Sequence, residues 1–232
     1  MPPSLKYQRV YVEIDDGVAA TQVQQTFFNP LPQQIEGTYV FPLPDDVALG
    51  DFSMTIGGKT LKGEVLEREA ARRTYEEIIR RVRDPALLEF LGKRLYQASI
   101  FPIPPGQQLD MKLQYSQTIS EHAGLGQFIH PLRSQAQTAG TIDELLVPVK
   151  VRSTLPLTSV FCPSHQCDVA RPSDREATVT YEVTHAQPER DFSLYDQRQD
   201  AQFGLARLAQ YFSIAERVLV VIEGAAYEVV PG

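Results

Sequence analysis

The chain has 232 residues, of which 43% are hydrophobic and 22% are charged, and its formal net charge at pH 7 is -7. This length suffices for one larger domain or two small ones with a real hydrophobic core, and the composition is that of an ordinary globular protein. The negative charge disfavours nonspecific binding to nucleic acid, which requires Lys and Arg side chains to neutralise phosphates, and no apolar run approaches the roughly twenty residues of a membrane span.

Strands are predicted along most of the chain, because apolar and polar side chains alternate in many short runs. Clear examples are Val10 to Ile14, Leu109 to Tyr115, Val147 to Val151 and Val179 to Val183. Asp15-Asp16-Gly17 and Gly57-Gly58 lie between such runs and are typical of hairpin turns. Alternation places one set of side chains in a core and the other in solvent, as antiparallel sheets allow. The sequence therefore predicts a mainly β protein, an antiparallel β-sandwich.

One long amphipathic helix is predicted as an insertion between strands, over residues 64–83. Its apolar side chains share a face at helical spacing: Ala71, Tyr75, Ile78, Ile79 and Val82. On the charged face, Glu residues precede Arg residues by four positions, which stabilises a helix by about 0.2–0.5 kcal/mol for each pair. Pro85 disfavours helical geometry at Asp84, so we expect the helix to end there.

The second half of the chain is predicted to add further strands. Residues 134–144 are polar, small and Gly-containing, which indicates a linker or long loop after a first domain over 1–133. Residues 145–200 are expected to form an accessory β region packed with that domain. Residues 201–232 are expected to form a helix and then a short apolar strand at Val218 to Ile222, in a tail that is either truncated or divergent.

A series of motifs at fixed spacing runs through residues 38–115, with weaker echoes from about Val10 to Leu132. The motifs are Tyr39-Val40-Phe41-Pro42-Leu43-Pro44, Phe52, Met54, Ile56-Gly57-Gly58, Gly63, Glu64, Glu67-Arg68-Glu69-Ala70, Tyr75-Glu76, Leu87-Leu88-Glu89 and Ile103-Pro104-Pro105-Gly106. Their order resembles the VIT domain, named after vault proteins and inter-alpha-trypsin inhibitor heavy chains. The resemblance implies a VIT domain over 1–133, and residues 160–195 look like the β region that commonly follows it.

The resemblance also implies a neighbour, because a von Willebrand factor A domain often follows a VIT domain. Arg217 to Ile222 looks like the first strand of such a domain, but the next residues, 223–226, lack the Asp and hydroxyl groups of its metal site. Asp51 to Thr55 fits the D-x-S-x-S/T metal pattern, yet Phe52 and Met54 alternate as in a strand and leave the hydroxyl groups on a polar face. We therefore predict no metal site in this chain.

Cys162 and Cys167 lie on either side of His165 in the segment FCPSHQC. The pattern is compatible with a local disulfide or a metal site. A zinc site requires four ligands, or three and a water, and the chain has no further Cys to complete one. The interpretation adopted is two small residues in a strand-turn-strand unit, and whether the two thiols form a disulfide stays open.

No catalytic motif is present. The chain lacks a Gly-x-Ser-x-Gly elbow, a phosphate-binding Gly-rich loop and a His-Glu-x-x-His helix, and its histidines are scattered singly: His122, His130, His165 and His185. We predict no catalytic residue, no cofactor and no enzymatic activity. The alternative is a carboxylate-based hydrolase, which would require a cleft holding two carboxylates of unlike environment.

These observations favour a non-catalytic structural or protein–protein interaction module that supports a larger assembly or an adjacent domain. The alternative is an extracellular adhesion or matrix-binding fragment whose metal-dependent A domain is absent from this chain. The predicted partner surface consists of Arg68, Arg72, Tyr75, Glu76 and Glu89, although Arg68 and Glu89 would equally serve to brace loops. Exposed sheet edges offer a second route to a partner.

The expected location depends on the true start of the protein. Met1 is followed by PPSLKYQRV, which lacks the basic start and the apolar stretch of a secretory signal. We expect a cytoplasmic protein if Met1 is the start, and a secreted or cell-surface protein if the chain is a fragment.

Overall fold

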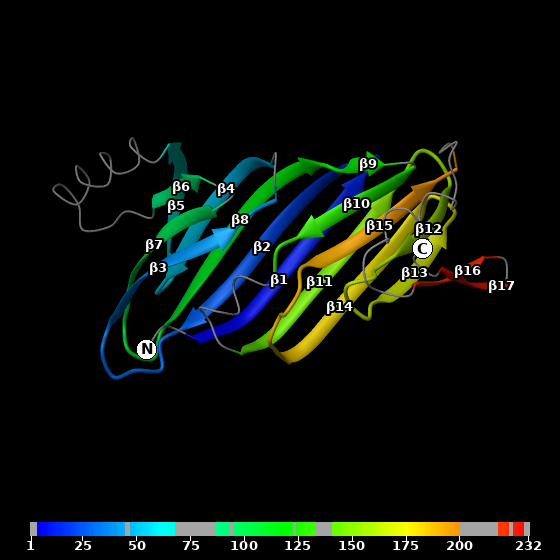
Figure 1. Cartoon of the computed structure of the whole chain (residues 1–232). Helices are drawn as coiled ribbons and strands as arrows, with labels where there is room; N and C mark the ends of the chain where they lie inside the picture. The colour runs from blue at the N-terminus through cyan, green and yellow to red at the C-terminus, as the bar shows by residue number, and fades with distance from the viewer. Residues whose placement is uncertain are drawn as a thin grey trace.

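The computed structural model describes residues 4–44, 47–67, 87–92, 95–122, 124–132, 141–199, 218–222 and 225–229, and within these residues it is built of strands, with no helix. The strands form an eleven-stranded sheet, a four-stranded sheet and a two-stranded hairpin (Figure 1). The hairpin consists of β16 (Val218–Ile222) and β17 (Ala225–Val229). The predicted apolar strand at Val218 to Ile222 is therefore confirmed.

The large sheet has the strand order β13-β14-β11-β1-β2-β8-β4-β5-β6-β7-β3. In chain order its strands are β1 (Ser4–Asp15), β2 (Val18–Phe28), β3 (Ile35–Pro42), β4 (Val47–Ile56), β5 (Lys59–Glu67), β6 (Leu87–Gly92), β7 (Leu95–Ile103), β8 (Gln108–Thr118), β11 (Ile142–Arg152), β13 (Asp168–Ser173) and β14 (Glu176–Ala186). β11 begins inside the predicted linker, and residues 133–140 lie outside the described residues.

The long central strands follow the predicted alternation. In β8 the side chains of Leu109, Met111, Leu113 and Tyr115 are buried, and the intervening Asp110 and Lys112 are exposed. The turn between β1 and β2 places Asp16 and Gly17 at φ angles of 43° and 86°, which a glycine adopts without steric cost. Gly57 and Gly58 form the corresponding turn between β4 and β5, with φ angles of 55° and 78°. Both predicted hairpins are confirmed.

Two strand pairs depart from the predicted antiparallel sheet. β11 runs parallel to β1, with Tyr7 opposite Glu144 and Val12 opposite Val149, and β6 runs parallel to β5. Parallel neighbours need a long crossover connection rather than a tight turn. Between β1 and β11 the chain forms the other strands of its first half and part of the second sheet. β11 then pairs with the edge of β1 opposite β2 and runs in the same direction as β1.

The four-stranded sheet has the order β12-β15-β10-β9, with bounds Leu157–Phe161, Phe192–Arg198, Leu125–His130 and Ser120–His122. It lies over one face of the large sheet, as the strands β10 and β15 show in Figure 1. Phe128, Phe192 and Leu194 on this sheet are buried in one hydrophobic core with Val147 and Val149 on β11. The core therefore lies between two layers of strands, as in a sandwich.

The predicted helix over residues 64–83 is wrong at its start, because Glu64 to Glu67 belong to β5. This strand pairs with β4 up to Gly63 and then with β6 from Glu64, opposite Leu87. The strand that follows the Gly57-Gly58 turn continues past the point where the helical charge pattern starts, because β6 takes over from β4 as its partner, so sheet pairing overrides the local helical preference. The remainder of the predicted helix, residues 68–83, lies outside the described residues.

A buried asparagine holds the corner where β2 ends and β8 begins. The Nδ2 atom of Asn29 donates to the carbonyl oxygens of Gln33 and Ile103, both at 2.8 Å, and its Oδ1 atom accepts from the backbone N–H of Leu31 at 2.9 Å. The backbone N–H of Gly106, at a φ angle of 68°, donates to the Asn29 carbonyl at 3.0 Å. The Pro-Pro-Gly corner is thus fixed by hydrogen bonds to one side chain and its backbone.

Candidate functional site

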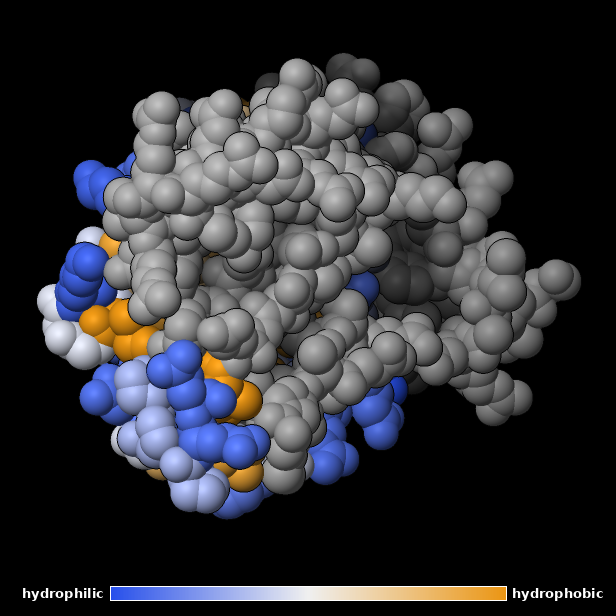
Figure 2. All heavy atoms as spheres, turned by 90° about the vertical axis from the view of Figure 1, so that its left-hand side faces the viewer, coloured by the Kyte–Doolittle hydropathy of each residue, from blue (hydrophilic) through white to orange (hydrophobic). Residues whose placement is uncertain are grey.

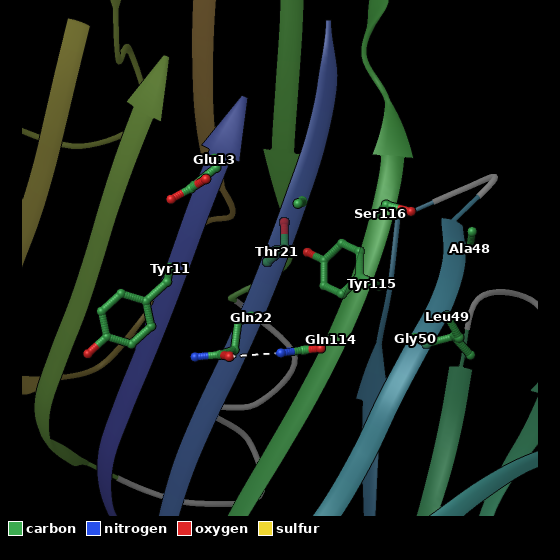
Figure 3. A pocket seen from close by; sticks show the side chains of 11 residues that line it. Tyr11, Glu13, Thr21, Gln22, Ala48, Leu49, Gly50, Gln114, Tyr115 and Ser116 are labelled. Carbon is green, nitrogen blue, oxygen red and sulfur yellow. Dashed lines mark hydrogen bonds between the residues drawn. The ribbon is translucent and has the colours of Figure 1, made fainter. Parts of the chain in front are cut away.

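The outer face of the large sheet carries a shallow concavity across four neighbouring strands, with a volume of about 540 Å³ (Figure 3). Its lining residues come from β1, β2, β4 and β8: Tyr11, Glu13, Ala20, Thr21, Gln22, Ala48, Leu49, Gly50, Gln114, Tyr115 and Ser116. Thr21 and Tyr115 are buried, so their side chains point to the core and only their backbone faces outward. We call this feature the outer concavity.

Small side chains leave the hollow open. Ala20 on β2 and Ala48 on β4 project outward with a single methyl group each, and Gly50 projects nothing. Gly50 lies in an irregular part of β4, where the register against β8 shifts between Leu49 and Phe52. A Cβ atom at Gly50 would stand 3.3 Å from the backbone oxygen of Gln114, so the two strands approach closely there.

Polar and aromatic groups surround the hollow. The Nε2 atom of Gln114 donates to Oε1 of Gln22 at 2.9 Å, and Figure 3 shows the Gln22 amide nitrogen pointing away from this bond. Tyr11 is 37% exposed, and it stands two residues from Glu13 on the same side of β1. The outer concavity therefore offers a phenol, a carboxylate and carboxamides beside small apolar side chains, a combination suited to polar and apolar groups of one ligand.

Charged side chains beside the outer concavity join β1 to β11. Lys6 pairs with Asp143 and Arg9 with Glu144, each at 2.8 Å, and the Arg9 guanidinium lies 5.4 Å from the centre of the Tyr7 ring. The hydrogen bonds that Arg9 donates to the Glu144 carboxylate raise the pKa of Arg9. Partly exposed pairs of this kind contribute about 0–1 kcal/mol each to stability. Their main effect here is to order the outer side chains next to Tyr7.

A different set of polar groups lies on the inner face, under the same strands. The Tyr115 hydroxyl and Nδ1 of His130 are 2.7 Å apart, and this contact joins β8 of the large sheet to β10 of the small one. Burial raises the pKa of Tyr115 and lowers the pKa of His130 to about 4. Both side chains are shielded from the outer concavity, so their role is to connect the sheets.

Of the five residues predicted to form a partner surface, the structure describes only the backbone of Glu89. Glu89 lies in β6, with its backbone opposite Leu66 and Gln97. The other predicted surface residues, Arg68, Arg72, Tyr75 and Glu76, lie outside the described residues. Figure 2 views the molecule from the end that carries β3 to β7, where the described part of the surface mixes hydrophilic and hydrophobic residues side by side.

The D-x-S-x-S/T match lies within β4, where Phe52 and Met54 are buried, as the alternation predicted. Among the residues that the structure describes, no three His, Cys, Asp or Glu side chains converge as metal ligands would. In the same part of the chain, no helix is long and apolar enough to cross a membrane.

The outer concavity was not predicted from the sequence. Its residues alternate with core residues along four strands, and each strand alone shows only ordinary outward positions. The available signal was the cluster of small residues at such positions, Ala20, Ala48 and Gly50. That signal has meaning only once β2, β8 and β4 are known to be neighbours.

Residues 5–115 match the family model of the vault protein inter-alpha-trypsin domain. The chain is 29% identical over 130 residues to the mouse (Mus musculus) protein mono-ADP-ribosyltransferase PARP4, covering 56% of this chain and 7% of that protein. It is 27% identical over 154 residues to human (Homo sapiens) von Willebrand factor A domain-containing protein 5A, covering 64% and 20%. It is 23% identical over 124 residues to inter-alpha-trypsin inhibitor heavy chain H4 of Bos taurus, covering 53% and 14%. The match thus spans at most a fifth of each of these relatives.

Among solved structures, the chain resembles a proposed nutrient-binding protein from Legionella pneumophila. The TM-score is 0.53 at 14% sequence identity, over 84% of this chain and 67% of that one. At this identity the likeness concerns the fold alone.

Proposed function

Residues 5–115 are a VIT domain, and on that premise we propose that this chain is a non-catalytic protein-interaction module that supports a larger assembly or a neighbouring domain. The three relatives described above are named for an ADP-ribosyltransferase, a von Willebrand factor A domain and a protease-inhibitor heavy chain. The segment that they share with this chain is a small part of each. A segment common to proteins of such different names is better explained by binding than by one reaction.

The outer concavity is the observation that supports a binding surface most directly. It faces away from the core on four paired strands, so it exists before any partner arrives, which lowers the entropic cost of binding. Glu13 is the single carboxylate among its described lining residues. The pair of unlike carboxylates that a hydrolase requires is therefore not found among them.

The proposed partner is an extended segment of a neighbouring domain or protein. An apolar side chain of that segment would contact Ala20 and Ala48. Its backbone amides would bond to the Gln22 and Gln114 carboxamides and the Tyr11 hydroxyl. Such a mixed contact is typical of interfaces in which a few central groups supply most of the affinity.

The test uses two variants of β2, each changed at one of two exposed positions that lie two residues apart on the same face. Ala20→Arg places a long charged side chain in the outer concavity, whereas Val18→Arg places the same side chain on the same face at a residue that is 52% exposed and outside the lining. Both chains serve as baits for affinity capture read by mass spectrometry. A partner retained by wild type and Val18→Arg but lost by Ala20→Arg supports the proposal, and equal retention by both variants contradicts the assignment of this face.

The residues predicted from the sequence provide a third bait, in which Arg68, Arg72 and Glu76 are changed to Ala. A partner lost with this bait alone would assign binding to that segment instead of the outer concavity. Absence of any specific partner would contradict the interaction module itself. The location of the protein, cytoplasmic or secreted, and the division at residues 134–144 stay predictions.

A further inference from the structure

The loop between β12 and β13 brings the two cysteines of the chain together. Cys162 and Cys167 are both half-buried free thiols. Sγ of Cys162 lies 3.6 Å from Oγ of Ser164, and Sγ of Cys167 lies 3.5 Å from the carbonyl oxygen of His165, the residue after Ser164. Each packs against the hydrophobic core. Two free thiols that adjoin neighbouring residues of one six-residue loop are positioned for an intramolecular bond rather than for separate reactions.

The loop is held in place by side-chain contacts to both sheets. Ser164 Oγ accepts a hydrogen bond from the backbone N–H of Ser193 on β15 at 2.8 Å, and it lies 3.6 Å from Sγ of Cys162. The His165 ring lies 4.4 Å from the ring of Tyr181 on β14, with its Nδ1 atom 2.8 Å from Ser164 Oγ. The thiols are thus presented by an ordered loop.

The surroundings of the two sulfur atoms differ. Cys162 is surrounded by donors: hydrogen bonds from the Cys167 thiol above all, then from His165 and Ser164, favour its thiolate and hold its pKa below the ordinary value. The Cys167 thiol donates to the carbonyl oxygen of His165, 3.5 Å away. The hydrogen bond to Cys162 raises the pKa of Cys167, with desolvation and the charge of Asp168 acting in the same direction. Only the thiolate form is a good nucleophile, so this asymmetry makes Cys162 the first to react.

We propose that Cys162 and Cys167 form a reversible disulfide by exchange with a low-molecular-weight disulfide, for which oxidised glutathione is the probe. The Cys162 thiolate attacks one sulfur of glutathione disulfide, the glutathione S–S bond breaks, and one glutathione thiolate leaves. The Cys167 thiol then loses its proton and attacks the Cys162 sulfur of the mixed disulfide, and the second glutathione thiolate leaves. The two cysteines lose two electrons, and one glutathione disulfide becomes two glutathione molecules.

The position of the loop gives this bond a structural effect. β12 ends at Phe161 in the four-stranded sheet, and β13 begins at Asp168 at the edge of the eleven-stranded sheet. A bond between Cys162 and Cys167 would therefore tie the edge strand of one sheet to the edge strand of the other. All six residues of β13 are exposed, so the bond would restrain a strand that has little packing of its own.

The test treats the reduced native chain with oxidised glutathione, quenches with acid, alkylates the remaining thiols and reads the intact mass. The expected product has lost the mass of two hydrogen atoms, takes up no alkyl group and releases two glutathione molecules per chain. Peptide mapping should join Cys162 to Cys167. Two stable glutathione adducts, a disulfide-linked dimer or an unmodified chain would each overturn the proposal.

Two single variants test the order of the steps. The Cys167→Ser variant should stop at one glutathione adduct on Cys162. The Cys162→Ser variant should form its adduct at least about tenfold more slowly, because its remaining thiol is the less ionised one. Equal rates of adduct formation in the two folded variants would overturn the assigned order. In concentrated urea the two rates should converge, and a difference that persists there would show that the loop geometry is not its cause.

Discussion

The carboxylate of Asp196 on β15 lies directly against Gly126 on the neighbouring strand β10. The two residues are opposite each other in the sheet, and a Cβ atom at Gly126 would stand 2.7 Å from Oδ2 of Asp196. Asp196 is 3% exposed and pairs with Nε of Arg198 at 3.3 Å. The glycine is therefore required because it leaves room for a buried carboxylate.

This contact predicts that Gly126→Ala destabilises the protein by about 1–3 kcal/mol, since the added methyl group must displace the carboxylate from its position. Urea unfolding measures the change. In an Asp196→Ala background the same substitution should cost clearly less, because the group that it displaces is absent. An equal cost in both backgrounds would assign the role of Gly126 to backbone conformation instead.

The buried His130 predicts a loss of stability in acid. Its pKa falls from 6.5 in the unfolded chain to about 4 in the folded one, because burial disfavours the imidazolium. The unfolded chain therefore binds more protons between these values, and stability falls by about 3 kcal/mol as the pH drops from about 6.5 to 4. Above pH 6.5 this residue adds no pH dependence.

Urea unfolding at a series of pH values checks the effect, with His130→Gln as the comparison. The carboxyl group of Asp196 has a raised pKa and so also titrates in acid, whereas Asp16 has a lowered pKa and titrates below this range. The difference between the two proteins isolates the imidazole. Parallel stability curves for wild type and His130→Gln would contradict the prediction.

The Tyr115 hydroxyl predicts a sharp contrast between two conservative substitutions. Tyr115→Phe leaves Nδ1 of His130 without its 2.7 Å partner in a buried site and should cost about 1–3 kcal/mol. Tyr11→Phe removes the same atom from an exposed ring on β1 and should change stability by less than about 0.5 kcal/mol. Similar effects of the two substitutions on the urea midpoint would exclude the contact as a significant stabilising interaction.

Asn29 predicts the strongest effect outside the hydrophobic core. Asn29→Ala leaves the carbonyl groups of Gln33 and Ile103 and the N–H of Leu31 without their partner, which we expect to cost about 2–4 kcal/mol by thermal or urea unfolding. Asn29→Asp keeps the acceptor for Leu31 but places a charge beside two carbonyl oxygens. It should therefore rescue little of the loss, and full rescue by Asp would show that the two donated bonds are unimportant.

The predictable part of the fold was the part where each strand has one face in the core. β8 and β1 alternate so regularly that their inward residues follow from the sequence, and the glycines between strands mark the hairpins. His130 also carried a usable signal, since it follows Phe128 by two residues in β10 and so shares its inward face. It was noted only as one of four scattered histidines, and its burial was not predicted.

The remainder depended on contacts distant in sequence. Nothing local to Glu64 indicates that β5 will continue from β4 to β6, and nothing local to Tyr7 indicates a parallel partner at Glu144. The outer concavity likewise exists only because the chain returns to place β8 between β2 and β4. Single-sequence patterns report which face of a strand is buried, and they do not report which strands meet.

The parallel pairing of β1 with β11 has a practical consequence for any shortened form of this protein. A fragment that ends at Leu132 would keep most of the residues that resemble other proteins, yet it would lose the neighbour of its first strand. The N–H and C=O groups of β1 that now pair with β11 would then form an open edge of the large sheet. Such edges are templates for pairing with further copies. We expect that fragment to aggregate or to form fibrous assemblies, and chains that extend through β15 to stay dispersed.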